Sequence, residues 1–322
     1  MRVGIAPAGS RDAATAVRMA QLAEQRGLAE LWLSEDYLER GAFTVAGGVA
    51  AATTRITIGL GVINPWTRHV GLAAMESAAL DELSGGRLIV GLGASNERWM
   101  QGMLGIAFER PVSTLLEYAG ALRALLAGEQ LDRTVGAHHV RAGLSFLPPR
   151  ADLPIFLGVK GPVALRRGSP VADGLMLSVL STPQYVTWVR ETYAPKRLTA
   201  YAFFSSDPDP DRARGRLKAR TGRFLGMHGP SPITLIPGLS EDLAAEFRAR
   251  ALRGEDATDL VSDDIVDLFT IAGDQGECVR GLHRFAQAGL DSLVVLDDGE
   301  SDPEIVVEAI SAAAISGGYI AA

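Results

Sequence analysis

The stretch VINPWTRHVGLAAMESAALDELSGGRLIVGLGASN, residues 62–96, indicates one strand–helix–strand unit. It begins at the end of an apolar run that starts at residue 56, and it closes with a second apolar run over residues 88–92. Between these runs, residues 70–83 indicate a helix, and the Ser-Gly-Gly break that follows is a common helix stop. Two strands joined through a helix lie parallel, so the segment predicts a parallel sheet.

The same alternation extends along the chain in both directions. Apolar runs indicate further strands at residues 3–6, 31–33, 155–157, 175–177, 199–204 and 292–296. Helical spacing indicates further helices at residues 13–26, 45–52 and 115–126. Two segments interrupt the alternation. We expect a short hairpin in residues 128–150, and additional helices but no strand in residues 229–275.

The overall composition excludes several classes of protein. The 322 residues are 47% hydrophobic with a net charge of −7, so the chain can bury a large core. No basic block indicates a nucleic-acid partner, and no apolar stretch reaches the ~20 residues that cross a membrane. Cys278 is the only cysteine, which excludes an internal disulfide and suits the reducing cytoplasm, where we expect the protein. Because free cysteines are often buried, we expect Cys278 to pack in the core. The length fits one (β/α)8 barrel with insertions or two ordinary domains.

In a parallel sheet, ligands bind at the carboxyl ends of the strands. The residues that follow the predicted strands are therefore the candidates for chemistry. They include Ala6, Glu35, Asp36, Gly61, Val62, Ile63, Asn64, Gly93, Ala94, Ser95, Asn96, Gly158, Val159, Lys160, Gly161, Pro162 and Ser178.

Three of these strand ends are rich in glycine. Gly59 and Gly61 lie in an otherwise apolar strand, where glycine marks a bulge or the close approach of another group. The GLGASN segment (91–96) ends the next strand in small residues, against which a flat ring could lie. The GVKGP segment (158–162) combines a helix start with a lysine, which suits a phosphate. Together they describe a site for a flavin-like nucleotide, whereas the structural alternative is that the glycines only make tight turns.

Other motifs are incomplete. GLGASN lacks the third glycine of G-x-G-x-x-G, because Asn96 stands there. His138 and His139 are adjacent, so on a strand they point to opposite sides, and we expect no metal site. For Arg68 and His69 we favour hydrogen bonds that fix their loop over contact with a cofactor or a second subunit.

Five segments together resemble the bacterial luciferase-like superfamily of (β/α)8 barrels. They are GVINPWTRH (61–69), LDELSGGRLIVGLGASN (80–96), LPIFLGVKGPVAL (153–165), ADGLMLS (172–178) and LFTIAGD (268–274). Within the superfamily they are most similar to the coenzyme F420-dependent methylenetetrahydromethanopterin reductases. The resemblance implies one (β/α)8 barrel domain over residues 1–322, with insertions. F420 is a deazaflavin that carries hydride at C5 and has a phosphate and an oligoglutamate tail.

The resemblance also implies roles for the strand-end residues. In relatives the third strand bulges behind the deazaflavin, often with a non-prolyl cis peptide bond, which here would be Gly61–Val62. Val62 would then press against one face of the ring. The residues along the edge of the ring would be Ala94, Ser95 and Asn96. Those at the phosphate would be Val159, Lys160 and Gly161.

This chain departs from the reductases where they carry acids. Ala6 replaces an acid after the first strand, Asn96 replaces one after the fourth, and residues 35–37 (EDY) lack the histidine that often follows the second strand. A reductase needs a proton as well as a hydride, and general acid catalysis contributes about 10²–10⁴-fold. Glu35 and Asp36 remain as candidate acids whose pKa burial would raise, with Asn96 as a further candidate catalytic residue.

These departures leave three functions open. The first, which we favour, is an F420-dependent oxidoreductase acting on a small organic substrate other than methylenetetrahydromethanopterin. The second is an FMN-dependent monooxygenase of the same superfamily. The third is a barrel that has lost catalysis, in which Glu35 and Asp36 form caps or pair with an arginine such as Arg40. The resemblance also implies a homodimer or a larger homo-oligomer, formed through helices near the second and third strands.

Overall fold

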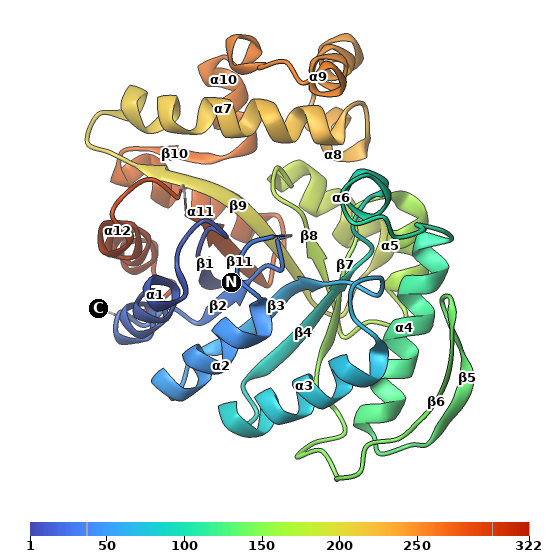
Figure 1. The fold of residues 1–322 in the computed structure, drawn as a ribbon. Coiled ribbons are helices and arrows are strands. Elements are labelled where there is room, and N and C mark those ends of the chain that lie inside the picture. Colours follow the sequence, from blue (N-terminus) through green and yellow to red (C-terminus); the bar gives the residue numbers. More distant parts are fainter. Residues whose placement is uncertain (37, 298, 322) are drawn as a thin grey trace.

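The computed structural model describes residues 1–36, 38–297 and 299–321. Within these residues, eight parallel strands close into a barrel surrounded by helices, which confirms the predicted (β/α)8 fold (Figure 1). The barrel strands are β1 (Arg2–Ala6), β2 (Glu30–Leu33), β3 (Thr57–Ile63), β4 (Leu88–Gly93), β7 (Ile155–Gly158), β8 (Gly174–Leu177), β9 (Leu198–Ser206) and β11 (Ser292–Leu296). Their order around the barrel is β11-β1-β2-β3-β4-β7-β8-β9, and the pairing of β9 with both β8 and β11 closes the ring.

The helices that follow these strands lie outside the barrel (Figure 1). They are α1 (Ala13–Gln25), α2 (Ala42–Ala52), α3 (Val70–Ser84), α4 (Pro111–Leu126), α5 (Pro162–Gly168), α6 (Pro183–Tyr193), α7 (Pro210–His228), α11 (Gln275–Gln287) and α12 (Pro303–Ser316). Gly85 ends α3 in the left-handed conformation, as the Ser-Gly-Gly break predicts. Cys278 is buried in α11, which confirms its packing role. No helix in the described ranges has both the length and the hydropathy that crossing a membrane requires.

Two segments interrupt the alternation of barrel strands and outer helices. The first is an antiparallel hairpin of β5 (Leu131–Val135) and β6 (His138–Ala142), which packs beside α4. The second contains α8 (Pro232–Leu235), α9 (Glu241–Arg253), the 3₁₀ turn η2 (Thr258–Leu260) and α10 (Asp263–Phe269). Together with α7, these helices form a layer above the carboxyl end of the barrel (Figure 1). A π-helical turn, η1 (Arg98–Met103), follows β4.

The expectation of no strand in residues 229–275 is wrong. The short strand β10 (Ile271–Gly273) pairs in parallel with the outer end of β9, where Ile271 lies opposite Phe204. Its residues are buried, and α7 and α11 pack against it. Three residues are too few to show alternation or a long apolar run, so tertiary packing rather than local sequence determines this strand.

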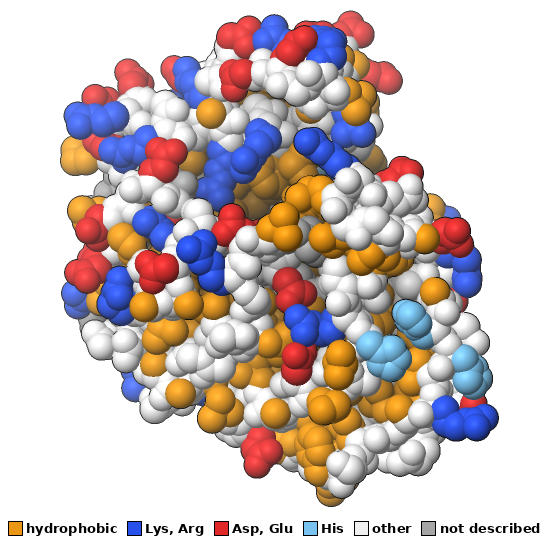
Figure 2. Space-filling model, viewed as in Figure 1, with side chains coloured by type: hydrophobic (Ala, Val, Ile, Leu, Met, Phe, Trp, Pro, Cys, Tyr) orange, Lys and Arg blue, Asp and Glu red, His pale blue; other side chains and the backbone are white. Residues whose placement is uncertain are grey.

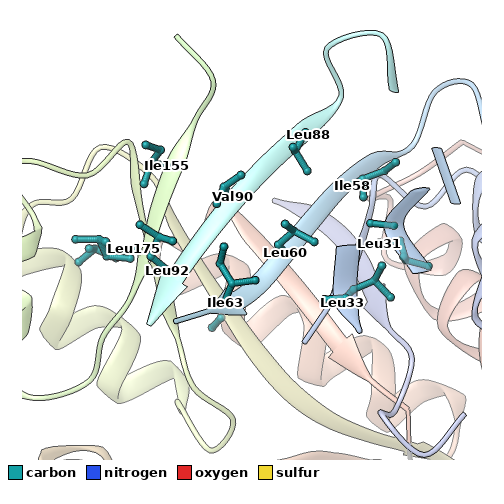
Figure 3. Close-up of a cluster of buried hydrophobic side chains, with 14 of the residues drawn as sticks. Leu31, Leu33, Ile58, Leu60, Ile63, Leu88, Val90, Leu92, Ile155 and Leu175 are labelled. Carbon is teal, nitrogen blue, oxygen red and sulfur yellow. The ribbon is translucent and has the colours of Figure 1, made fainter. Parts of the chain in front are cut away.

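Two groups of apolar side chains lie on either side of the barrel wall, and a third lies between β9 and the layer of α7, α9 and α10. The outer group lies between the strands and the helices, and Figure 3 labels Leu31, Leu33, Ile58, Leu60, Ile63, Leu88, Val90, Leu92, Ile155 and Leu175. The inner group lies inside the barrel, with Trp32 and Phe156 as its largest members. A Cβ on Gly59 would lie 2.0 Å from the Trp32 ring, so that strand glycine makes room for the indole. The barrel below its mouth is thus a packed core.

Candidate active site

The predicted site residues lie together at the carboxyl end of the barrel. They follow six strands that are consecutive around the barrel, in the order β1, β2, β3, β4, β7 and β8. Because these strands are parallel, their carboxyl ends form one continuous arc of the rim. Figure 2 shows a hollow in the surface below α7, with hydrophobic side chains on its floor and Lys and Arg side chains along its edge.

The third strand bulges where the sequence predicts it. The pairing of β3 with β4 shifts register near the end of β3, and the Gly61–Val62 peptide bond is cis, as the resemblance implies. The Val62 side chain extends over the neighbouring strand ends. A Cβ on Gly93 would lie 2.5 Å from Val62 Cγ2, and a Cβ on Gly158 would lie 2.7 Å from Val62 Cγ1. These two glycines therefore make room for Val62, and a ring lying over them would meet that side chain first.

Tyr201 in β9 completes the bulge and was missed by the sequence analysis. Its hydroxyl donates a hydrogen bond to the Gly61 carbonyl oxygen at 2.9 Å, and a Cβ on Gly61 would lie 2.2 Å from that hydroxyl. Burial raises the pKa of Tyr201 well above its ordinary value, and the charges of Asp36 and Glu30 raise it further. Tyr201 lies in the middle of the predicted strand 199–204, and only the closing of the barrel brings it to Gly61.

The first acid after β2, Glu35, is part of a salt bridge. Its Oε1 accepts a hydrogen bond from Arg68 Nη2 at 2.6 Å, and Arg68 Nη1 donates to Glu76 at 2.7 Å. The arginine named in the structural alternative, Arg40, pairs with Glu39 instead. Burial of the Arg68 guanidinium is the largest single effect and acts to lower its pKa, but the charge and hydrogen bond of Glu35 together with the charges of Glu76 and Tyr118 outweigh it, and the pKa of Arg68 is raised.

The second acid, Asp36, has different surroundings. It is half-buried, and its Oδ2 accepts a hydrogen bond from Ser34 Oγ at 3.0 Å. A Cβ on Gly9 would lie 2.9 Å from the same oxygen, so the loop after β1 closes over this carboxylate. In the part of the chain that the structure describes, Asp36 has no salt-bridge partner. Tyr37, the next residue of the predicted segment, lies outside the described residues.

Three predicted contact residues have side chains that are engaged elsewhere. Ala6 is buried inside the barrel, and Ile63 is fully buried in the outer core (Figure 3). Asn64 Oδ1 accepts hydrogen bonds from the N–H groups of Trp66 at 2.8 Å and Thr67 at 3.1 Å, which fixes the turn after β3. A ligand at this part of the rim would therefore meet mainly the backbone of these residues.

The end of β4 contains one engaged side chain and one unpaired one. Asn96 Oδ1 accepts a hydrogen bond from the Trp99 N–H at 3.1 Å, so it caps the π-helical turn that follows. Ser95 has a positive φ of 61°. Its hydroxyl oxygen is buried and has no hydrogen-bond partner among the described residues. Ala94, before it, is partly buried against the outer core.

Lys160, after β7, contacts the far end of α7. Its Nζ donates to His228 Nδ1 at 3.0 Å, and because an ammonium group only donates, His228 is neutral and accepts through that atom. Burial, and then the charge of Lys160, lower the pKa of His228 to about 3. Part of the Lys160 side chain is exposed to solvent. Partial desolvation by the surrounding protein nevertheless lowers the pKa of Lys160, and the positive charge of Arg248 lowers it further.

The residues beside Lys160 differ in their availability. The Val159 N–H donates to the Met176 carbonyl oxygen at 3.2 Å and is therefore used by the sheet. Gly161 is open, because a Cβ there would meet no atom within 4 Å, and Pro162 follows as the first residue of α5. After β8, Ser178 accepts hydrogen bonds from Ser181 through its carbonyl oxygen.

Other parts of the molecule offer less. His69 Nδ1 accepts a hydrogen bond from the Gly71 N–H at 3.1 Å, which confirms that it fixes its loop. Among the described residues, no group of three or more His, Cys, Asp or Glu side chains could hold a metal ion. A separate hollow of about 360 Å³ between α5 and α6 is lined in part by Ser169 and Lys196, which precede their strands. It therefore lies at the amino end of the barrel and contains none of the candidate site residues.

Comparison with known proteins agrees with this geometry. The family model described as luciferase-like monooxygenase matches residues 1–292. The chain belongs to this family. This chain is 28% identical over 289 residues to a 5,10-methylenetetrahydromethanopterin reductase of Methanolobus tindarius. The match covers 85% of this chain and 87% of the relative. The chain is also 26% identical over 302 residues to a putative coenzyme F420-dependent oxidoreductase of Mycobacterium tuberculosis, with 83% and 84% covered.

A solved structure has the same fold. It is the coenzyme F420-dependent tetrahydromethanopterin reductase from Methanopyrus kandleri, with a TM-score of 0.79, 24% identity and coverage of 97% of this chain and 98% of that chain. These similarities confirm both the predicted superfamily and the predicted resemblance to F420-dependent reductases. At 24% identity the structural similarity concerns the fold, so the roles of site residues depend on this chain's own geometry.

Proposed function

We propose that this luciferase-like protein is a coenzyme F420-dependent oxidoreductase that transfers a hydride between the cofactor and a small organic substrate. The observation that carries the proposal is the unbroken arc of β3, β4 and β7, which contains the Val62 bulge, the unpaired Ser95 hydroxyl and Lys160. The Mycobacterium tuberculosis relative and the Methanopyrus kandleri reductase are both described as F420-dependent, which supports the same cofactor here.

The residues at this rim suit a deazaflavin with a phosphate. Leaving a buried hydroxyl without a hydrogen-bond partner costs about 1–3 kcal/mol of free energy. A hydrogen bond from a bound ligand to the Ser95 hydroxyl would remove this cost. One strand further, Lys160 provides an ammonium group next to the open space at Gly161. These features support a ring near β3 and β4 and a phosphate at the end of β7.

In this proposal the strand ends divide the work of binding. Val62 supports one face of the ring, Ser95 lies at its edge, and Lys160 with Gly161 holds the phosphate. When bound, F420 supplies a carbon, C5, that carries a hydride. The other predicted contact residues line the site mainly with backbone atoms: Ala6, Gly61, Ile63, Asn64, Gly93, Ala94, Asn96, Gly158, Val159, Pro162 and Ser178.

We assign the proton of the reaction to Asp36. Glu35 is already engaged by the Arg68 guanidinium, which donates to its Oε1 at 2.6 Å. Asp36 is half-buried, has no salt-bridge partner among the described residues and lies close enough to Tyr201 to raise the pKa of that phenol. Asn96 acts in this scheme by capping the turn after β4, through its bond to Trp99, and so positions the neighbouring Ser95.

We further propose that methylenetetrahydromethanopterin is not the substrate. The resemblance implies acids at the ends of the first and fourth strands, where this chain has the buried Ala6 and the cap Asn96. A site built for other polar contacts would leave polar groups of the pterin without hydrogen-bond partners, and unpaired buried polar groups strongly weaken the binding of a substrate. The substrate is therefore a different small organic molecule.

We also propose that two copies associate through α3. This helix exposes Leu72, Met75 and Leu83, each more than half exposed, with the spacing of one helix face. Figure 2 shows further hydrophobic side chains over the face that α2 and α3 form. Apolar stripes of this kind favour association between protein surfaces.

Equilibrium titration with F420 and with FMN tests the cofactor assignment. We expect F420 to bind, with FMN at least ten times weaker, and reduced F420 to be consumed only when an organic substrate is present. Tight FMN binding without F420 binding would instead support the monooxygenase, and oxygen uptake with reduced FMN would support it independently. Binding of F420 without turnover on any substrate would support a barrel that has lost catalysis.

A further inference from the structure

Among the described residues, three tyrosines each make the same kind of long-range hydrogen bond. Each donates its hydroxyl hydrogen to a main-chain carbonyl oxygen of a distant element. Tyr201 in β9 bonds to Gly61 at 2.9 Å, and Tyr185 in α6 bonds to Lys160 at 2.5 Å. Tyr118 in α4 bonds to Arg68 at 3.0 Å. Two of the three acceptors, Gly61 and Lys160, belong to the proposed cofactor site, and the third does not.

Tyr201 reaches the bulge from across the barrel. In the closed ring of eight strands, β9 lies opposite β3, so the Tyr201 side chain crosses the space below the mouth to reach Gly61. Gly61 is matched to this contact, because a Cβ there would lie 2.2 Å from the hydroxyl. The hydroxyl therefore fixes the main chain directly before Val62, the residue that supports the ring.

Tyr185 fixes a different part of the site. It is fully buried, its ring packs on Trp188 with 5.4 Å between centroids, and burial raises its pKa, so the hydroxyl stays protonated as a donor. Its acceptor is the carbonyl of Lys160, whose side chain is held separately by His228. Main chain and side chain of Lys160 are thus each fixed by one hydrogen bond.

We propose that Tyr201 and Tyr185 are two independent positioning residues, one for the ring of the cofactor and one for its phosphate. This inference rests on the proposed function. Tyr201 acts through Gly61 and Val62, and Tyr185 acts through Lys160. Because the two bonds hold different strand ends, β3 and β7, loss of one hydroxyl leaves the other contact in place.

Removing single hydroxyl groups tests the division of roles. F420 and a phosphate-free deazaflavin riboside are titrated into the wild type and into Tyr201→Phe, Tyr185→Phe and Tyr118→Phe. We expect Tyr201→Phe to weaken both ligands by about tenfold, as loss of one hydrogen bond to a buried carbonyl implies. We expect Tyr185→Phe to weaken F420 by a similar factor and to leave the riboside unchanged.

Tyr118→Phe is the matched control. It removes the same group from a buried tyrosine bound to a carbonyl outside the site, so both affinities stay within about twofold of the wild type. A merely structural role of Tyr201 would lower thermal stability without weakening either ligand, and a merely structural role of Tyr185 would lower it without changing the ratio of the two affinities. If a Phe variant does not fold, the His variant, whose shorter ring cannot reach the carbonyl, replaces it with the same expectation.

The outcomes separate the two levels of the proposal. The role of Tyr185 is overturned if Tyr185→Phe keeps the wild-type ratio of F420 affinity to riboside affinity. The role of Tyr201 is overturned if Tyr201→Phe binds both ligands as tightly as the wild type. In either case, F420 binding by the wild type leaves the proposed function intact. Failure of the wild type to bind either deazaflavin overturns the proposed function and, with it, this inference.

Discussion

Single residues at the barrel mouth are explained by partners that come from other strands. The sequence marks Gly59 and Gly61 as places of a bulge or close approach, and the structure identifies the approaching groups as Trp32 and Tyr201. Gly93 was expected to lie against a flat ring, and in the structure the Val62 side chain lies next to it. The positions were predictable because glycine in an apolar strand is a local signal. The partners were not, because they depend on which strands lie opposite each other in the closed barrel.

Gly59→Ala tests the packing of the barrel interior. The new methyl group would lie 2.0 Å from the Trp32 ring, which is fully buried and hydrogen-bonded to Glu30, so the indole cannot move freely. We expect the free energy of unfolding to fall by about 3 kcal/mol, measured by urea denaturation. Gly47→Ala in α2 is the control, because its Cβ meets no atom within 4 Å, and it should raise stability by up to about 1 kcal/mol. Equal stability of the two variants would contradict the packing.

Replacing each of the two acids after β2 by its amide, one at a time, separates their roles. We expect Asp36→Asn to lower kcat of the F420-loaded protein by about 10²-fold, because an amide cannot supply the proton, with little change in stability. Glu35→Gln should mainly lower the free energy of unfolding, because it removes the charge that pairs with Arg68. Steady-state kinetics and urea denaturation of both variants make the comparison. The opposite pattern would assign the proton to Glu35.

At the scale of elements, most boundaries follow from local chemistry. The helix stop at Gly85 and the apolar runs of the barrel strands agree with the sequence to within a few residues, because caps and hydrophobic patterns act locally. β10 was missed because its three residues form a strand only through pairing with β9. The hairpin of β5 and β6 was found because its length and flanking turns are visible in the sequence.

Glu24 joins α1 to the start of β3, and its titration should be visible in the stability of the protein. Its carboxylate accepts hydrogen bonds from the N–H groups of Thr54, Arg55 and Ile56 at 3.0, 2.6 and 2.8 Å. Burial acts to raise the pKa of Glu24, but these three donors outweigh it and the pKa is lowered. A lowered folded-state pKa stabilises the fold above the ordinary value near 4.5, and this stabilisation is lost as the pH falls through the lower folded value.

We therefore expect Glu24→Gln to be less stable than the wild type at pH 7. The difference should shrink steadily as the pH falls below about 4.5 and the wild-type carboxylate is protonated. Urea denaturation of both proteins between pH 3 and pH 7 measures it. Glu129→Gln, at an exposed position after α4, should show no such trend. A stability difference that stays constant with pH would contradict the role of the carboxylate.

At the scale of the whole molecule, the site exists only when the barrel is closed. Tyr201 and Gly61 are separated by 140 positions in the chain, and their hydrogen bond connects opposite walls of the barrel. α7 crosses the carboxyl end and reaches Lys160 through His228 (Figure 1). The hollow below α7 has an apolar floor and a cationic edge (Figure 2).

The outer face of α3 makes a prediction about assembly. Met75 is 52% exposed in the middle of the apolar stripe, so Met75→Lys should turn a dimer into a monomer in sedimentation equilibrium. Leu252→Lys on α9 is the control, because Leu252 is 71% exposed on a different surface and should leave the dimer intact. A monomeric wild type, or a Met75→Lys variant that remains dimeric, would exclude the α3 interface.

A crystal structure of the protein grown with F420 tests the central claim most directly. We expect the deazaflavin ring against Val62 with its edge at Ser95, and the phosphate between Lys160 and Gly161. The claim would be contradicted by a ring bound elsewhere, for example in the hollow between α5 and α6, or by F420 in the mouth with its phosphate far from Lys160.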